Sequence, residues 1–353
     1  SNIKSAGLKY ICKQQRIARD NRVYVDHDKI AKLRFDTNPY WINIKTGEWS
    51  ESSDKNIPED WEEISGKEIV EKYLLDDIWE TLEVDNSFNQ SSFLMAKILP
   101  TVYERVSTMG TASIWKLLML SWSYENGLAV PEKGEKRSFT GGLSRILKVG
   151  YSKDIVKLDY ASLYPSIMIT HGVYPECDVS GAMHAMLQYL YDTRNKYKYK
   201  ANECAAEGDK KMASFFKAKQ LPIKIINNSM YGSLTAPQVF NWGDVMKGEE
   251  VTCTARMYLR LLVRFFENRG FIPLVLDTDG CNFSVPKSTD DYKYVGKGIH
   301  HFVEKDKHYD GTEAVVAEFN DLYMRGVMGL DIDGFWKSSI NVSRKNYADL
   351  TED

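Results

Sequence analysis

The strongest chemical signal in this 353-residue sequence is a carboxylate placed at the end of an apolar run. The run at 155–158 predicts a β-strand that ends at Asp159. Ser162 and Pro165 then indicate a turn, because proline is excluded from central strands. Such a turn exposes backbone N–H groups beside the acid, which suits a divalent cation held against a phosphate. An Asp after a strand can also cap a helix, so the choice depends on the rest of the chain.

The segment 224–232 places a cation, an amide and a ring at helical spacing. Lys224, Asn228 and Tyr231 stand at i, i+4 and i+7, which is one face of a helix. Such a face could contact a phosphate, a sugar edge and a base in turn.

A third segment, 274–283, combines an apolar run, the sequence Asp277-Thr278-Asp279 and a second apolar run. This pattern predicts a β-hairpin with two acids at its tip. Because side chains two residues apart in a strand point the same way, we expect Asp277 and Asp279 on one side.

In this order, the three segments resemble the palm motifs of the B-family DNA polymerases, DxxSLYPSI, KxxxNSxYG and DTD. The resemblance covers roughly residues 65–350. It implies an α+β fold in which an antiparallel palm sheet carries the three acids and a helical hairpin forms the fingers. It also implies an N-terminal region that is part of a 3′–5′ exonuclease domain of the RNase H-like type.

The same resemblance predicts how the chain is divided. We expect a partial exonuclease domain at 1–90, a helical connector at 91–138, palm at 139–181, fingers at 182–232 and palm again at 233–353. The family's thumb would follow, and we expect it to be absent from this chain, which would then be a fragment or a split subunit.

The implied reaction is template-directed addition of deoxynucleoside triphosphates to a primer 3′-hydroxyl by a DNA-directed DNA polymerase with two magnesium ions, for which manganese could substitute. By resemblance, Asp159 and Asp279 bind the metals together with the backbone carbonyl of Tyr160, and Asp277 supports the site electrostatically. By the same resemblance, Tyr164 stacks under the sugar and excludes a 2′-hydroxyl. The implied nucleotide-binding set is Ser162, Leu163, Tyr164, Arg194, Lys198, Lys224, Asn228 and Tyr231.

A basic stretch adjoins these motifs. Residues 194–224 contain nine basic and three acidic residues, in a chain whose net charge is only −3. Such a local concentration is the expected footprint of a phosphate partner. Arg194 and Lys198 share one helical face, and Lys196 and Lys200, offset around the helix, are the competing pair for the triphosphate.

Weaker motifs point to the primer, the template and the exonuclease. Gly141 and Gly142 belong to a segment that resembles the family's Y/FxGG, and Lys345 and Tyr347 resemble its KxY motif; both motifs would contact primer or template. Tyr73 and Asp77 resemble the exonuclease YxxxD motif. No convincing counterpart of the family's acid–x–acid pair on an early strand precedes it, so we expect no exonuclease activity from this chain alone.

One departure from the family pattern concerns the third motif, where Gly280 stands in place of the usual Ser. Both metal-binding acids remain, so we expect activity to be possible with altered local geometry.

Other expectations concern secondary structure. Ser65 and Glu68 form a capping-box pattern that predicts a helix over 65–84. Residues 91–128 and 244–269 are expected to be helical, with Trp115 in the core and Met257 on a core-facing side. The polar stretch 291–316 is also predicted as a helix.

Composition restricts the location and the partners. The five cysteines are scattered without zinc spacing, which indicates reduced thiols in a cytosol-like compartment, the host cytoplasm if the source is a phage or another virus. No signal peptide or membrane span is found in the sequence. The expected partners are primed DNA template and dNTPs, with a separate thumb-bearing chain and a sliding clamp as further candidates.

One alternative from a different class remains, a non-catalytic DNA-binding or scaffold subunit derived from such a polymerase. A reverse transcriptase is disfavoured, because its third motif carries adjacent acids.

Overall fold

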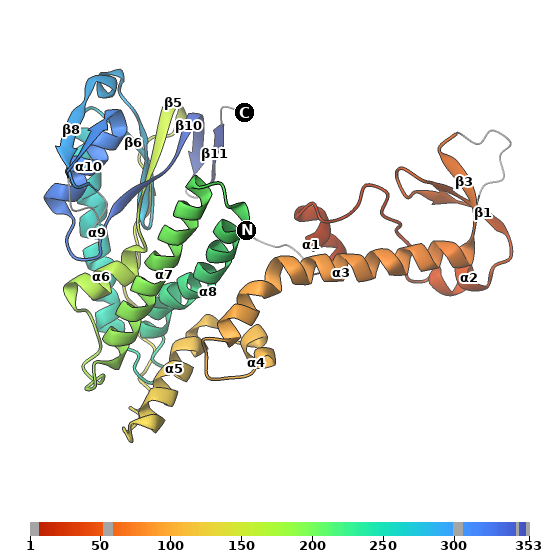
Figure 1. The fold of residues 1–353 in the computed structure, drawn as a ribbon, viewed down its shortest axis with the longest axis horizontal. Coiled ribbons are helices and arrows are strands. Elements are labelled where there is room, and N and C mark those ends of the chain that lie inside the picture. The colour runs from red at the N-terminus through yellow and green to blue at the C-terminus, as the bar shows by residue number, and fades with distance from the viewer. Residues whose placement is uncertain (1–6, 52–58, 299–305, 344–345, 351–353) are drawn as a thin grey trace. The chain divides into compact units, whose positions relative to one another are not determined.

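The structure is a computed structural model that describes residues 7–51, 59–298, 306–343 and 346–350. The chain divides into two compact units, Ser1–Leu94 and Met95–Asp353. Each is described by itself (Figure 1). Within the described residues, no helix is both long enough and apolar enough to cross a membrane.

The first unit combines a small sheet with one long helix. Its three strands, β1 (Pro39–Asn43), β2 (Trp49–Ser50) and β3 (Trp61–Ser65), form an antiparallel sheet in the order β2-β1-β3. Two short helices, α1 (Leu8–Gln14) and α2 (Ile30–Phe35), precede it, and α3 (Gly66–Ala96) follows it. A separate core forms where α2, β1, β3 and the start of α3 meet; its buried side chains include Leu33, Tyr40, Ile42, Ile64, Ile69 and Val70.

The predicted capping box opens α3. Glu68 Oε2 accepts hydrogen bonds from the Ser65 backbone N–H (2.9 Å) and hydroxyl (2.7 Å), and the Glu68 N–H donates to Ser65 Oγ (3.2 Å). These reciprocal bonds satisfy N–H groups that the first turn of a helix leaves without an intrahelical acceptor. The predicted helix over 65–84 is confirmed, although it continues to Ala96.

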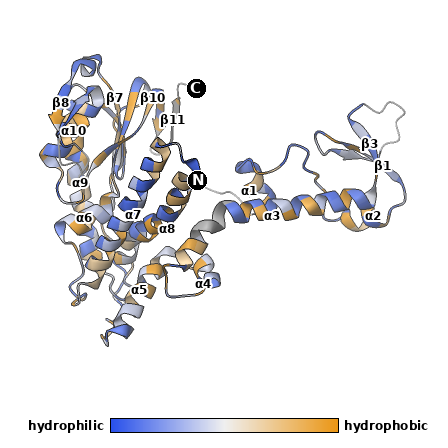
Figure 2. Ribbon diagram, in the orientation of Figure 1, coloured by the Kyte–Doolittle hydropathy of each residue, from blue (hydrophilic) through white to orange (hydrophobic). Residues whose placement is uncertain are grey.

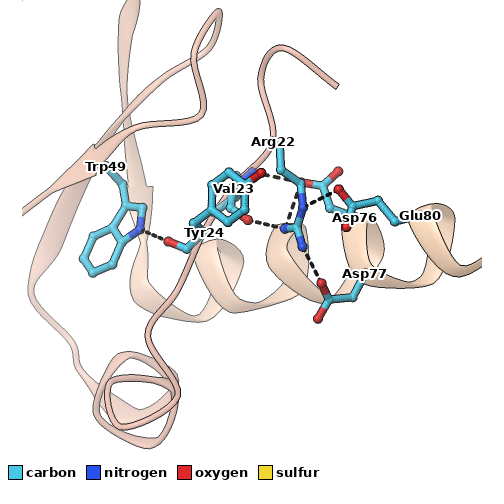
Figure 3. A network of polar contacts seen from close by, with 7 residues as sticks. All are labelled: Arg22, Val23, Tyr24, Trp49, Asp76, Asp77 and Glu80. Carbon is cyan, nitrogen blue, oxygen red and sulfur yellow. Dashed lines mark hydrogen bonds and ion pairs between the residues drawn. The ribbon is translucent and has the colours of Figure 1, made fainter. Parts of the chain in front are cut away.

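One buried arginine ties the segment before the sheet to α3 (Figure 3). Arg22 Nε donates to Glu80 Oε1 (2.9 Å), and the same guanidinium forms ion pairs with Asp76 and Asp77. The Val23 N–H donates to Asp76 (3.0 Å), which fixes the backbone as well. Burial alone would lower the pKa of Arg22, but the hydrogen bond and charge of Glu80, with the two Asp charges, raise it. The cluster therefore keeps an internal cation among three acids.

The second unit is organised around a six-stranded antiparallel sheet in the order β11-β10-β5-β7-β6-β4. Its strands are β4 (Ser144–Ile146), β5 (Gly150–Tyr160), β6 (Ile272–Asp277), β7 (Gly280–Ser284), β10 (Leu330–Ser343) and β11 (Asn346–Leu350). This sheet, with the helices around it, confirms the predicted α+β class.

Successive side chains of β5 point to opposite faces of the sheet, and this alternation determines which of them are buried in the core. Val156, Leu158 and Tyr160 are buried in the main core, whereas Lys157 and Asp159 are only partly buried on the opposite face. The helices that contribute to that core include α6 (Leu163–His171), α9 (Val245–Glu267) and α10 (Gly311–Tyr323). The strand therefore presents Asp159 on the face away from the core.

Two antiparallel helices form the predicted hairpin. Helix α7 (Ala182–Ala206) packs against α8 (Lys210–Leu234), and Gly208 between them has φ +84°, a conformation that glycine adopts without steric cost. Helices α4 (Tyr103–Thr108) and α5 (Thr111–Glu125) precede the sheet. Trp115 of α5 is fully buried and its Nε1 donates to the Ile226 carbonyl of α8 (2.8 Å), which confirms its predicted core position.

Two predictions are wrong, one about residues 291–316 and one about Met257. Residues 291–316 are not one helix: after the 3-10 turn η1 (Lys287–Asp291), strands β8 (Lys293–Gly296) and β9 (Lys307–Asp310) pair antiparallel, and α10 begins at Gly311. The carboxylate of Asp321 on α10 accepts the N–H groups that follow β8 (2.9 Å each), so tertiary contacts override the local pattern. Met257 is 62% exposed, because α9 turns Leu259, Leu262 and Phe266 to the core.

Candidate active site

Two adjacent strands bring Asp159 and Asp279 together. Asp159, one residue before the end of β5, lies directly opposite Gly280 of β7, and the Tyr160 N–H donates to the Asp279 carbonyl (2.8 Å). Asp279 itself lies in the two-residue turn between β6 and β7, whose other residue, Thr278, has φ +60°. The predicted hairpin with acids at its tip is present, but Asp279 belongs to the turn and not to a strand.

Gly280 permits this close arrangement. A Cβ atom added there would lie 2.4 Å from the Leu158 carbonyl oxygen and 2.6 Å from Asp159 Oδ1. Both distances are far below van der Waals contact, and the first involves backbone that cannot rotate away. The absence of a side chain at 280 therefore lets the Asp159 carboxylate lie directly against β7.

Electrostatics at the pair indicate an excess of negative charge. Burial and the neighbouring charge of Asp279 raise the pKa of Asp159 to about 7. Burial and then the charge of Asp277 raise the pKa of Asp279. Lys157 opposes the shift in both, but two carboxylates this close and this buried still resist simultaneous ionisation.

Sequence reasoning missed two further acids, Asp331 and Asp333 of β10. Asp331 pairs in register with Asp159, and the charges of both raise the pKa of Asp159 further. Lys198 Nζ lies 3.3 Å from Asp331 Oδ2, and Lys157 Nζ lies 2.5 Å from Asp333 Oδ2. An acid–x–acid pattern in a strand was the available signal, but only the register of β10 with β5 places it at the site.

The acids fit a divalent cation that is shared with a ligand. Within the described ranges, no three His, Cys, Asp or Glu side chains converge to form a complete metal cage. Magnesium is usually held by one or two carboxylates plus substrate phosphates. Asp159 and Asp279, whose pKa values are raised by burial and by neighbouring negative charge, supply such a partial set.

The start of α6 supplies donors beside the acids. Ser162, the N-cap, has φ +50°, and the helix begins at Leu163; the first intrahelical bond runs from the Ser166 N–H to the Ser162 carbonyl (3.0 Å). Helix geometry leaves the N–H groups of Leu163 and Tyr164 without an intrahelical acceptor, and Pro165 has none to offer. A helix N-terminus of this kind favours an anion.

One cavity of about 520 Å³ is lined by Asp159 and Asp279, by the start of α6 and by the hairpin of α7 and α8. Its basic wall consists of Arg194 and Lys198 from α7 and Lys224 from α8. Arg194 Nη1 donates to Ser162 Oγ (2.5 Å), and burial lowers the pKa of this arginine. Of the competing lysines, Lys196 is exposed and Lys200 lies over the Phe216 ring. The structure thus turns Arg194 and Lys198 toward the cavity.

Aromatic and amide groups border the same space. The rings of Tyr164 and Tyr231 are 4.4 Å apart between centroids, and Asn228 lines the cavity. A Cβ at Gly142 would lie 2.6 Å from the Tyr164 hydroxyl, so this glycine packs against the ring. A Cβ at Gly141 would meet open space.

Arg256 of α9 was also missed by the sequence reasoning. Its Nη1 donates to the carbonyls of Thr140 (2.8 Å) and Gly141 (2.6 Å) and so holds this glycine segment in place. Arg256 is one of three arginines in this amphipathic helix, and the sequence carried no signal for its contact with the glycine segment.

Other predicted residues lie elsewhere. Tyr73 and Asp77 are on α3 of the first unit, where Asp77 pairs with Arg22 and the Lys9 ammonium lies 4.6 Å from the Tyr73 ring centroid. Lys345 lies outside the described residues. Tyr347 belongs to β11, opposite Asn341 of β10.

Comparisons with known proteins support the resemblance drawn from the motifs. The chain is 28% identical over 326 residues to DNA polymerase 1 of Pyrococcus abyssi, covering 84% of this chain and 40% of that protein. It is 26% identical over 328 residues to the DNA polymerase of Thermococcus gorgonarius, with 85% and 40% coverage. No family model matches the chain.

A solved structure shares the fold. The family B DNA polymerase of Pyrobaculum calidifontis superposes with a TM-score of 0.65 at 18% identity, covering 99% of this chain and 42% of that one. The chain therefore spans about two fifths of the length of the proteins it matches.

Proposed function

We propose that this chain, a relative of the family B DNA polymerases, adds deoxynucleoside monophosphates from dNTPs to a primer 3′-hydroxyl under the direction of a template strand. The supporting observation is a single cavity with two closely coupled acids on one wall and three cations on the other. This arrangement matches a triphosphate whose charge is shared between metal ions and basic side chains.

In the proposed reaction, the primer 3′-oxygen attacks the α-phosphorus. The bond from that phosphorus to the bridging oxygen breaks, the hydroxyl proton passes to water, and pyrophosphate leaves in line. Magnesium, when bound, supplies positive charge to the attacking and leaving oxygens. Asp159 and Asp279, with the Tyr160 carbonyl, would hold it, and Asp277 would add negative potential behind them.

The cations and the helix start would position the triphosphate. Arg194 now donates to Ser162 (2.5 Å), and it would exchange this partner for phosphate oxygens, for which its planar fork is well suited. Lys224 and Lys198 would add charge, although Lys198 must first leave Asp331. The Leu163 N–H at the start of α6 is available to the same oxygens.

Selection would rest on the residues that border the cavity. Tyr164, packed against Gly142 and the Tyr231 ring, would lie under the sugar and leave no room for a 2′-hydroxyl. Asn228 and Tyr231 would shape the space for the new base pair. Template sequence would be read by base pairing and not by the protein.

Primer extension with magnesium and all four dNTPs tests the proposal, comparing the natural chain with Asp279→Ala. We expect extension by the natural chain and a loss of about 10²–10³-fold or more in the variant. Asp26→Ala, which removes a carboxylate that is 77% exposed in the first unit, is the matched control and should extend normally. Absence of both extension and magnesium-dependent dNTP binding in the natural chain would contradict the proposal and favour a scaffold role.

A further inference from the structure

Beyond the cavity, aromatic rings and lysines interleave between α7 and α8; we name this group the aromatic–lysine cluster. It consists of Tyr197, Lys200, Phe215, Phe216 and Lys219. Tyr197 stacks on Phe216 (6.1 Å between centroids, 26°) across the two helices, and Phe215 meets Phe216 edge-on (5.4 Å). Lys219 lies 4.5 Å from the Phe215 centroid, and Lys200 lies 5.5 Å from that of Phe216.

Exposure and charge set this cluster apart from ordinary core packing. Phe215 is 45% exposed although it is a large apolar ring. Further lysines lie on the same two helices, and all of them are exposed: Lys196, Lys210, Lys211 and Lys217. In the part of the chain that the structure describes, none of these lysines, nor Lys200 or Lys219, forms an ion pair with a carboxylate. Figure 2 shows hydrophilic and hydrophobic residues mixed along both helices.

Aromatic rings beside lysines that have no carboxylate partner in the described structure are typical of binding sites for one class of ligand. Single-stranded nucleic acids are bound where positive charge follows the backbone and aromatic side chains stack on unpaired bases. A duplex hides the faces of its bases, and an acidic peptide would use the lysines but not the rings. A base stacks on an exposed ring more strongly than a lysine does, so a base can displace Lys219 from Phe215 while the ammonium moves to a phosphate.

We propose that the aromatic–lysine cluster binds single-stranded DNA. Resting on the proposed function, we assign that strand as the unpaired part of the template. Tyr197 stands between the cavity residues Arg194 and Lys198 on α7, and Phe215 is nine residues before Lys224 on α8. Nine helical residues rise roughly 14 Å along the helix axis, a distance that a few nucleotides can span.

The test measures binding of a labelled single-stranded oligodeoxynucleotide and of a hairpin duplex of equal length by fluorescence anisotropy, without dNTP or magnesium. Phe215→Leu keeps an apolar side chain but removes the ring. We expect it to weaken single-strand binding by about 5- to 100-fold and to leave duplex binding unchanged. Phe35→Leu is the matched control, because Phe35 is 78% exposed with the Arg34 guanidinium 5.7 Å from its ring, and it should bind as the natural chain does.

The lysines give an independent measurement that does not depend on the ring variant. Replacing Lys200 and Lys219 with Ala should reduce the slope of log affinity against log salt for the single strand by about 1.4, at about 0.7 for each phosphate that is no longer neutralised by a lysine. Lys45→Ala with Lys67→Ala removes two equally charged, exposed lysines of the first unit and should leave the slope unchanged.

Two results would overturn the inference: single-strand affinity that does not respond to Phe215→Leu, or an equal loss on single strand and duplex. Because these measurements involve no catalysis, they are independent of the primer-extension test. A ring-dependent single-strand affinity in a chain that cannot extend primers would support the binding surface and contradict the template assignment alone.

Discussion

The two units treat buried carboxylates in opposite ways. On α3, Asp76, Asp77 and Glu80 surround the Arg22 guanidinium, whose side chain is only 2% exposed (Figure 3). In the second unit, no cationic side chain of the described residues forms an ion pair with Asp159 or Asp279, and Lys157 pairs with Asp333. The first cluster is neutralised mainly from within, and the second retains negative charge. The difference suggests that the first serves folding and that the second awaits a cation from solution.

The pKa directions express the same contrast. The Arg22 pKa is raised, because Glu80 and the two Asp charges outweigh the effect of burial. The Asp159 pKa is raised to about 7 by burial and the Asp279 charge, so ionisation there is costly without a counter-charge. Asp77 is paired with an arginine, whereas in the described part of the chain no arginine pairs with Asp159 or Asp279.

The largest expected effect comes from removing the internal cation. Arg22→Met leaves three acids around an uncompensated site, and we expect the first unit to lose about 3–5 kcal/mol of unfolding free energy. Denaturant unfolding of the full chain measures this loss, followed by tryptophan fluorescence, to which the first unit contributes Trp41, Trp49, Trp61 and Trp79.

Arg34→Met is the control for that loss, because Arg34 contacts only its neighbour's exposed ring in the described structure, and it should change stability little. Adding Glu80→Gln to Arg22→Met should recover part of the stability, since it removes the most buried of the three charges. A fully stable Arg22→Met chain would break the comparison, because the acids would then not need their cation.

The next largest effect is expected at Gly280, which lies against the Asp159 carboxylate. Gly280→Ala places a methyl group against the Leu158 carbonyl and the Asp159 carboxylate. We expect about 1–3 kcal/mol of destabilisation and a weaker rise in thermal stability on adding magnesium. Gly232→Ala is the matched control, because a Cβ there meets open space in α8, and it should be neutral or slightly stabilising. An unchanged magnesium response in Gly280→Ala would show that the glycine does not position Asp159.

Much of this contrast could be predicted from local sequence, but not all of it. Strand-end acids, the i, i+4 and i+7 face of α8 and the capping box are local patterns, and the structure contains each of them. Arg22 lies 55 residues before Asp77 in a stretch without motif, so nothing local announced their pairing.

The errors share that cause. Asp331 and Asp333 reach the site only through the register of β10 with β5. The β8–β9 pair replaced a predicted helix, and Asp321 of α10 accepts the backbone N–H groups that follow β8. Met257 was predicted to face the core from the helical period of apolar residues alone. The helix is rotated so that Leu259 faces inward and Met257 is exposed. Register and rotation depend on long-range packing, which a single sequence does not display.

The smallest expected effect is a pH dependence of native stability that arises from Asp159. Between its ordinary pKa of 3.8 and its folded pKa of about 7, Asp159 keeps a proton in the native state that the unfolded chain has released. Native stability must therefore fall as pH rises through this window, and the cost is complete above pH 7. Asp159→Asn removes the titration, so the variant should equal the natural chain near pH 4 and exceed it at pH 8. We expect a gain of roughly 1–2 kcal/mol, because partial exposure screens the full shift.

Thermal unfolding at pH 4, 6 and 8, with and without magnesium, measures both halves of this prediction. At pH 8, magnesium at 100 times its Kd should return about 2.7 kcal/mol to the natural chain and little to Asp159→Asn. Asp26→Asn, a carboxyl that is 77% exposed, should follow the natural chain throughout. If Asp159→Asn gained no stability at pH 8, the pair would already be neutralised within the protein. The two clusters would then differ in geometry but not in their need for a cation.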